Sequence, residues 1–255
     1  MVKNITNLAR LLNIAVTLAR YDALFPLIQI GIAPWMLKTM GLIAWFFPKP
    51  HDLGTRQGQH LAAALTQLGP SFIKFGQSLA TRSDLIGEEI AADLSALQDK
   101  LPPFSSAIAR AAITHELGEP VETLYENFTD EPVAAASIAQ VHKAKINDNG
   151  TIKDVAIKIL RPDIKKIFNE EIDAMMLFAF FIESFVKKTK RLKLVEVVFL
   201  LKEITNLEMD LRFEAAAANE YAENTKNDAG FKVPQIYWNF TSENVMTLDW
   251  IDGVS

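Results

Sequence analysis

One lysine in this sequence lies in the strand-like context that phosphoryl-transfer chemistry uses. The side chains of Val155-Ala156-Ile157-Lys158 alternate as in a β-strand. A lysine on a strand can reach the α and β phosphates of ATP, where its positive charge offsets theirs. Four such common residues also recur by chance, so a solvated surface lysine is the alternative interpretation. The neighbouring segments must decide between the two.

The segment ahead of this lysine differs from a usual phosphate-binding loop. Such loops are rich in glycine, because glycine adopts positive φ without strain. Here Ala134–Val141 reads Ala-Ala-Ala-Ser-Ile-Ala-Gln-Val. Alanine resists positive φ, so we expect this loop not to fold over phosphates as a glycine loop does.

A second polar motif is Lys74-Phe75-Gly76-Gln77, which falls in a segment with helical spacing. On a helix, Lys74 and Gln77 share a face, and Gly76 lets another backbone approach closely. Taken alone, this segment is better interpreted as a solvated lysine and glutamine beside a tolerated glycine.

The third feature is an acidic cluster, Glu208, Asp210 and Glu214. In one continuous helix Asp210 and Glu214 share a face, and like charges at that spacing are destabilising unless a cation lies between them. Lys158 and Lys74 are the candidate cations. Glu208 does not share that face, so spacing alone assigns it no role.

Together these segments resemble the UbiB family of atypical protein-kinase-like proteins, over about residues 61–253. Lys74–Gln77 matches the family's K-x-G-Q motif, and Glu208–Asp210 matches its E-x-D motif. Ala134–Val141 followed by Val155–Lys158 matches its alanine-rich loop and lysine strand. The K-x-G-Q helix and the alanine-rich loop are both foreign to ordinary protein kinases, which makes the resemblance specific.

The resemblance implies a site. Lys158 and Glu214 would form the catalytic Lys–Glu pair, while Lys74 and Gln77 would lie against Glu208 and Asp210 as a regulatory gate. The implied ligand is ATP or ADP with Mg²⁺. Its expected contacts come from the loop, the strand and the hinge after it: Ala134, Ala135, Ala136, Ser137, Val141, Ala156, Lys158, Leu248, Asp249 and Ile251.

The catalytic-loop aspartate and the metal ligands are absent from this sequence and would belong to a missing C-terminal lobe. We therefore expect no metal ligands here, and a chain that is inactive alone. The four histidines are scattered, which predicts structural roles. The absence of cysteine excludes disulfides, thiolate metal sites and a cysteine nucleophile.

The segments that carry these residues predict an α+β fold. It is a kinase-like small lobe with an antiparallel sheet and long helices, preceded in the sequence by an N-terminal helical extension. Strands are expected at 133–146, 151–160, 232–238 and 244–248, the first two joined by an Asn-Gly turn. Helices are expected at 55–68, from Pro70, and at 88–97, 105–117, about 163–186 and 195–224. The expected domains are 1–50, an apolar arm; 51–130, a helical extension with K-x-G-Q; and 131–255, the lobe up to its hinge.

The arm suggests a membrane. Residues 23–47 are strongly apolar but are interrupted by Pro26, Pro34 and Lys38, and a lysine at mid-bilayer costs about 2.5–3.5 kcal/mol. We expect helices lying in a membrane interface; an arm packed on the protein's own missing half is the alternative. The basic run Lys187–Lys193 is either a solvated helix end or a contact for anionic lipid. The expected location is peripheral, on the cytoplasmic face of a membrane, the inner membrane if bacterial.

The function that the resemblance implies is an atypical kinase or ATPase that supports ubiquinone biosynthesis. Its expected partners are nucleotide, a membrane lipid or quinone precursor, and other quinone-pathway enzymes. The net charge of -5 gives no reason to expect nucleic acid. The main alternative is a non-catalytic scaffold that binds nucleotide and lipid. A ring hydroxylase would need a G-x-G-x-x-G flavin fingerprint, which is absent, and a purely helical membrane protein would leave Val155–Lys158 unexplained.

Overall fold

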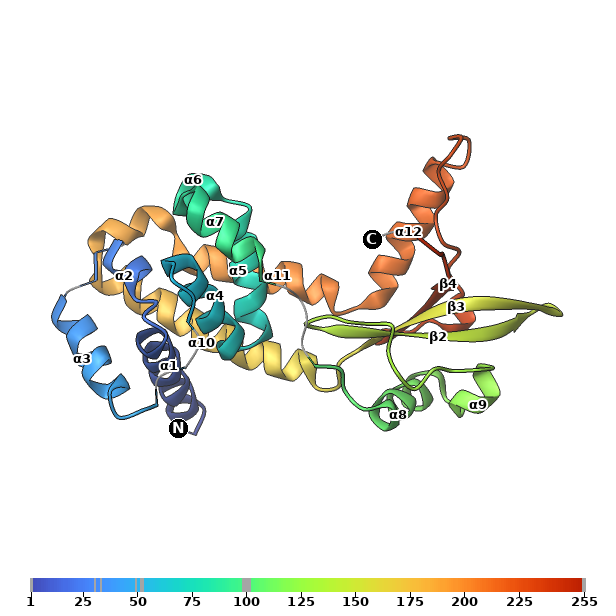
Figure 1. Cartoon of the computed structure of the whole chain (residues 1–255), viewed down its shortest axis with the longest axis horizontal. Coiled ribbons are helices and arrows are strands. Elements are labelled where there is room, and N and C mark those ends of the chain that lie inside the picture. Colours follow the sequence, from blue (N-terminus) through green and yellow to red (C-terminus); the bar gives the residue numbers. More distant parts are fainter. Residues whose placement is uncertain are drawn as a thin grey trace. The chain divides into compact units, whose positions relative to one another are not determined.

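The structure is a computed structural model that describes residues 2–29, 31–32, 34–48, 50, 53–97 and 102–253. The chain divides into two compact units, and each is described here by itself (Figure 1). A helical unit comprises residues 1–98 and 166–203, and a sheet unit comprises residues 99–165 and 204–255.

The helical unit contains most of the helices of the chain. They are α1 (Val2–Arg20), α2 (Phe25–Gln29), α3 (Pro34–Ala44), α4 (Gln57–Leu68), α5 (Pro70–Ala80), α6 (Ser83–Ile86), α7 (Glu88–Ser95), most of α10 (Ile164–Phe185), the 3-10 helix η1 (Lys187–Leu192) and most of α11 (Leu194–Glu208). Helices α4, α5 and α7 pack against one another, and α1 packs against α3 and α4. The buried stripe of α10 follows the predicted spacing, with Phe168, Ile172 and Met175 all inside.

The turn between α4 and α5 is built around Gly69. Its φ of 122° is strained for any residue with a side chain, and Pro70 then fits the first position of α5. A Cβ at Gly69 would collide with the carboxylate of Glu171 in α10. That carboxylate accepts a hydrogen bond of 2.9 Å from the backbone N–H of Ser71. Glu171 therefore caps the N-terminus of α5, the helix that carries Lys74 and Gln77.

The apolar arm folds as three helices, α1 to α3. Asp22 adopts a left-handed conformation between α1 and α2, and Pro34 begins α3. Several large apolar side chains at the start and end of α3 and just beyond it are exposed: Trp35, Leu42, Trp45, Phe46 and Phe47. Among the helices of the described residues, none is both long and apolar enough to cross a bilayer.

The sheet unit contains a four-stranded antiparallel sheet in the order β1-β2-β3-β4. The strands are β1 (Ala134–Ala135), β2 (Ala139–Asp148), β3 (Thr151–Leu160) and β4 (Val245–Asp249). The hairpin between β2 and β3 turns at Asn149 and Gly150, both with positive φ, as the sequence predicts. The predicted α+β class and antiparallel sheet are confirmed.

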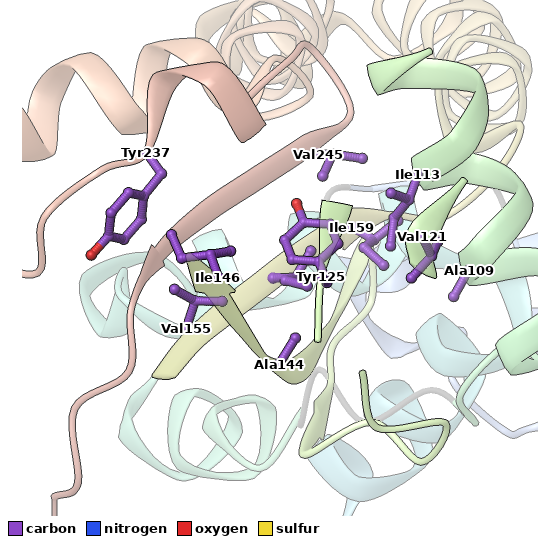
Figure 2. Close-up of a cluster of buried hydrophobic side chains, with 11 residues drawn as sticks. Ala109, Ile113, Val121, Tyr125, Ala144, Ile146, Val155, Ile159, Tyr237 and Val245 are labelled. Carbon is purple, nitrogen blue, oxygen red and sulfur yellow. The ribbon is translucent and has the colours of Figure 1, made fainter. Parts of the chain in front are cut away.

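The core of the sheet unit lies on one face of the sheet, beneath α8 (Ser106–Leu117) and α9 (Val121–Leu124). Figure 2 shows side chains from both helices meeting the strands. The cluster consists of Ala109, Ile113, Val121, Tyr125, Ala144, Ile146, Val155, Ile157, Ile159, Tyr237 and Val245. Tyr125 also shares a hydrogen bond of 2.8 Å with the Thr247 hydroxyl, and its burial raises the pKa of the phenol. This face is therefore filled, and a ligand would have to use the other one.

Three predicted elements differ from the structure. The first predicted strand, 133–146, is divided by a turn at Ala136–Ala139 into β1 and β2. The predicted strand 232–238 is reduced to a single bridge from Ile236 to Leu248, because Pro234 has no N–H to donate to a ladder. The predicted helix 195–224 is interrupted: α11 ends at Glu208, and α12 (Leu211–Asn224) begins after the N-cap Asp210.

Candidate functional site

The centre of the candidate site is an ion pair between the sheet and α12. Lys158 Nζ lies 2.7 Å from each carboxylate oxygen of Glu214. Lys158 is on β3, paired with Val141 of β2 and Met246 of β4, so strands flank it on both sides. Glu214 is in the first turn of α12. The side chains are 27% and 49% exposed, which leaves the pair accessible to a ligand.

The position of Glu214 depends on how α12 begins. The Asp210 side chain accepts a hydrogen bond of 3.1 Å from the Arg212 N–H, the usual N-cap geometry. The Arg212 guanidinium binds the same carboxylate at 2.9 and 2.6 Å, and this contact holds the pKa of Asp210 below its usual range. Leu211 is buried, and its N–H donates to the carbonyl of Glu243, which attaches the helix to the segment before β4. Glu243 also pairs with Lys165.

Four of the predicted nucleotide contacts on β2, β3 and β4 share one face of the sheet. Val141 is paired with Lys158, Ala156 lies two residues before Lys158, and Leu248 is paired with Ala156. Paired residues and residues two apart on a strand point to the same side. All four are half-buried, unlike the fully buried side chains of the opposite, core face. The site therefore has a partly apolar floor beside a cation.

The hinge residues do not all belong to this face. Asp249 is paired with Val155, which places it on the core side. There its carboxylate accepts hydrogen bonds from the Tyr237 hydroxyl at 2.6 Å and from the Gln235 N–H at 3.2 Å. The structure thus gives Asp249 a structural role in fastening the segment before β4. Ile251 follows β4 and is exposed.

One contact at the edge of the site was missed by the sequence analysis. Lys143 is paired with Ala156 and so lies on the same face as Lys158. Its ammonium group is 4.4 Å from the centre of the Trp250 ring, a cation–π distance. Trp250 Nε1 donates to Asp252 at 2.7 Å. The sequence could have suggested only that Lys143 lies on the same side of its strand as Val141; its contact with Trp250 depends on the pairing of β3 with β4.

The alanine-rich loop is a tight turn between β1 and β2. The Ala136 N–H donates to the carbonyl of Ala139 at 2.7 Å, and every residue of the turn keeps negative φ. Ser137 at the tip is 1% exposed, and its hydroxyl has no hydrogen-bond partner among the residues that the structure describes. The loop therefore closes without glycine, and it does so as a compact turn.

The K-x-G-Q residues have roles inside the helical unit. A Cβ at Gly76 would lie 2.7 Å from Leu65 Cδ1 and nearer still to Leu97 Cδ1, so glycine allows α4, α5 and α7 to pack closely. Gln77 Nε2 donates to the Leu97 carbonyl at 3.2 Å. Lys74 is half-buried. Glu208 and Asp210 belong to the sheet unit, and the predicted gate between these two pairs of residues stays a prediction.

Within the described ranges, no three histidine, aspartate or glutamate side chains gather in a group that could hold a metal ion. His142 is buried instead against Gln140, with its Nδ1 2.7 Å from the Thr129 carbonyl. Burial holds the pKa of this imidazole below its usual value.

Comparison with known proteins identifies relatives of this chain. Residues 96–255 match the model of the ABC1 atypical kinase-like domain. The chain is 40% identical over 98% of its length to a protein of Marinobacter nauticus described as probable protein kinase UbiB. Proteins with the same description from Shewanella piezotolerans and Pseudomonas paraeruginosa are 38% and 35% identical over 89% and 96% of the chain. The chain spans 45%, 41% and 46% of these relatives, a little under half of their length.

Proposed function

The chain belongs to the ABC1 atypical kinase-like family, and from this premise we propose that its sheet unit binds the phosphates of ATP or ADP with Mg²⁺. The single observation that carries the proposal is the Lys158–Glu214 ion pair. A lysine held by a helical glutamate keeps its ammonium group extended from the strand, where phosphate oxygens can accept from it.

The surroundings of the pair support the same ligand. Val141, Ala156 and Leu248 offer half-buried apolar surface beside Lys158, which suits the base of a nucleotide. Ser137 supplies a buried hydroxyl without a partner among the described residues, at the tip of the turn between β1 and β2. Because Ser137 is 1% exposed, a phosphate oxygen would satisfy that hydroxyl only after a movement of the turn. The remaining proposed contacts are Ala134, Ala135, Ala136, Asp249 and Ile251, of which Asp249 would contribute through its backbone.

The relatives described as probable protein kinase UbiB extend the proposal to the whole protein. We propose an atypical kinase or ATPase that supports ubiquinone biosynthesis at a membrane, with Mg²⁺ ligands supplied outside this chain. The alternative is a scaffold that binds nucleotide and lipid without phosphoryl transfer. ATP turnover, measured in a chain as long as these relatives, separates the two, since a scaffold would bind nucleotide and turn over none.

A membrane surface is the second proposed partner, together with a quinone precursor dissolved in it. Trp45 and Phe46 are each 75% exposed, and Trp35 on the same arm is 67% exposed. Exposed Trp and Phe side chains on or just beyond a helix are typical of protein segments that lie in a bilayer interface. Lys190 and Arg191 in η1 are exposed basic residues of the same unit and would favour anionic lipid.

The nucleotide proposal is tested by titrating the 255-residue chain with Mg·ATP and Mg·ADP in a calorimeter. Replacing a hydrogen-bonded charge removes about 1.5–3 kcal/mol, so Lys158→Met should weaken binding by about tenfold or more. The matched control is Lys153→Met. Lys153 lies on the same strand in an ion pair with Asp148 at 2.6 Å, but it alternates to the other face.

Equal affinity of the wild type and Lys158→Met would refute the site, as would a wild type that binds neither nucleotide at millimolar concentration. An equal loss of affinity in Lys153→Met would show that the effect is a general weakening of β3.

A further inference from the structure

Arg161, the residue after β3, contacts the alanine-rich turn through both its side chain and its backbone, and it belongs to none of the sequence motifs. Its Nε and Nη2 both donate to the carbonyl of Ala136, at 3.2 and 3.0 Å. Its backbone N–H donates to the carbonyl of Ile138 at 2.8 Å. One residue thus binds two carbonyls of the four-residue turn Ala136–Ala139, one through its side chain and one through its backbone.

The same guanidinium also holds the chain segment that leads into the sheet unit. Arg161 Nη2 donates to the Pro102 carbonyl at 3.0 Å, and the guanidinium carbon lies 5.6 Å from the centre of the Phe104 ring. Gln140 on β2 holds Phe104 from the other side, since its amide accepts from the Phe104 N–H at 3.0 Å and donates to the Phe104 carbonyl at 3.3 Å. Gln140 is fully buried. The turn is therefore braced against Pro102–Phe104.

We propose that Arg161 is a positioning residue for the nucleotide site: it fixes the conformation of the alanine-rich turn, and this conformation sets the affinity for nucleotide. The inference rests on the proposed function, because it concerns the same site. Arg161 is not proposed to touch the ligand.

The conformation of the turn matters for nucleotide affinity because a carbonyl oxygen carries partial negative charge. A backbone carbonyl directed at a phosphate would repel it, and a glycine loop avoids this by rotating its peptide groups. Alanine resists that rotation, so this turn needs another means of controlling the Ala136 carbonyl. A guanidinium supplies two donors in a fixed fork, which engages the carbonyl and holds its direction.

The test compares hydrogen exchange and nucleotide affinity in the 255-residue chain for wild type, Arg161→Gln and Arg161→Lys. In Arg161→Gln we expect exchange at residues 133–141 to accelerate by about tenfold, while amides of β3 and β4 keep their protection. Affinity for Mg·ADP should fall by about three- to tenfold. Arg161→Lys keeps the charge but loses the planar fork, so it should lie between the two, and it carries the test if the glutamine variant does not fold.

Arg110→Gln is the matched control. Arg110 belongs to the same unit and binds Glu122 and Asp130, but none of its hydrogen bonds reaches the turn. It should leave both exchange at 133–141 and the affinity unchanged.

Unchanged exchange in both Arg161 variants would overturn the inference, as would acceleration spread evenly over β2 to β4, which is what a merely structural role predicts. Accelerated exchange with unchanged affinity would also overturn it. If the wild type binds no nucleotide, the proposed function fails together with the effect of the turn on affinity, and the exchange data still decide whether Arg161 holds the turn.

Discussion

Gly76→Ala should destabilise the helical unit, even though alanine is the better helix former. The residue is buried in the middle of α5, and an added Cβ would lie 2.7 Å from Leu65 Cδ1 and closer to Leu97 Cδ1. Both leucines are buried, so they can yield only by changing rotamer or by moving α4 or α7. Overpacking of this kind costs about 1–3 kcal/mol, whereas alanine regains about 1 kcal/mol of helix propensity. We expect a net loss of about 1 kcal/mol.

Gly41→Ala provides a matched control, because Gly41 is also inside a helix, α3, but a Cβ there would meet nothing within 4 Å. The propensity term then acts alone and should stabilise α3 by up to about 1 kcal/mol. The two substitutions are chemically identical and are predicted to have opposite signs.

Native-state hydrogen exchange is the suitable assay, because the chain has two compact units and one global unfolding energy would mix them. Amides of α4, α5 and α7 should exchange about fivefold faster in Gly76→Ala. Adding Leu97→Ala should remove part of the penalty, since it empties the space that the new methyl group needs. If Gly76→Ala is as stable as wild type, the close packing of α4, α5 and α7 is not what requires this glycine.

Three further predictions concern other parts of the chain. Burial raises the pKa of the Glu171 carboxyl above its ordinary 4.5, so the folded state binds this proton more tightly than the unfolded state does. The helical unit should therefore lose stability as the pH rises from 4.5 through the raised pKa of the folded state. In Glu171→Gln, the free energy of unfolding measured from pH 4 to 7 should lack this decline. The double substitution of Trp45 and Phe46 by serine should reduce flotation with anionic vesicles by at least about tenfold, and equal flotation would mean that the arm is not a membrane contact. In a chain as long as its relatives, Lys74→Ala should change ATP binding or turnover if the gate exists, and Asp210→Asn should act in the same direction.

The hairpin of β2 and β3 and the face of it that carries Lys158 could be predicted from the sequence because their causes are local. Alternation over Thr151–Leu160 defines β3, and the Asn149-Gly150 turn fixes its register against β2. That register alone is enough to place Val141 beside Lys158. The pairing of Lys158 with Glu214 came from the family resemblance and agrees with the geometry of the structure.

The contacts made by Arg161 and by Lys143 could not be predicted in this way. Each joins segments far apart in sequence: Arg161 reaches Pro102, and Lys143 reaches Trp250. In the sequence pattern, an arginine or a lysine in or just after a strand is the same whether its side chain contacts a carbonyl, an indole ring or water. Only the tertiary fold decides which.

The interruption between α11 and α12 shows how a local rule can overrule periodicity. The apolar spacing of residues 195–224 continues through the break, so a single helix is the natural prediction. Asp210 instead uses its carboxylate to accept the Arg212 N–H, which ends one helix and starts the next. Aspartate in the E-x-D motif therefore has a structural task, which is to set the first turn of α12 and with it Glu214. Because asparagine caps helices as well as aspartate does, Asp210→Asn preserves that task while removing the charge, whereas Asp210→Ala removes both. A difference between these two variants therefore measures the cap, and the effect of Asp210→Asn alone measures what the charge contributes through its ion pair with Arg212 and through the proposed gate.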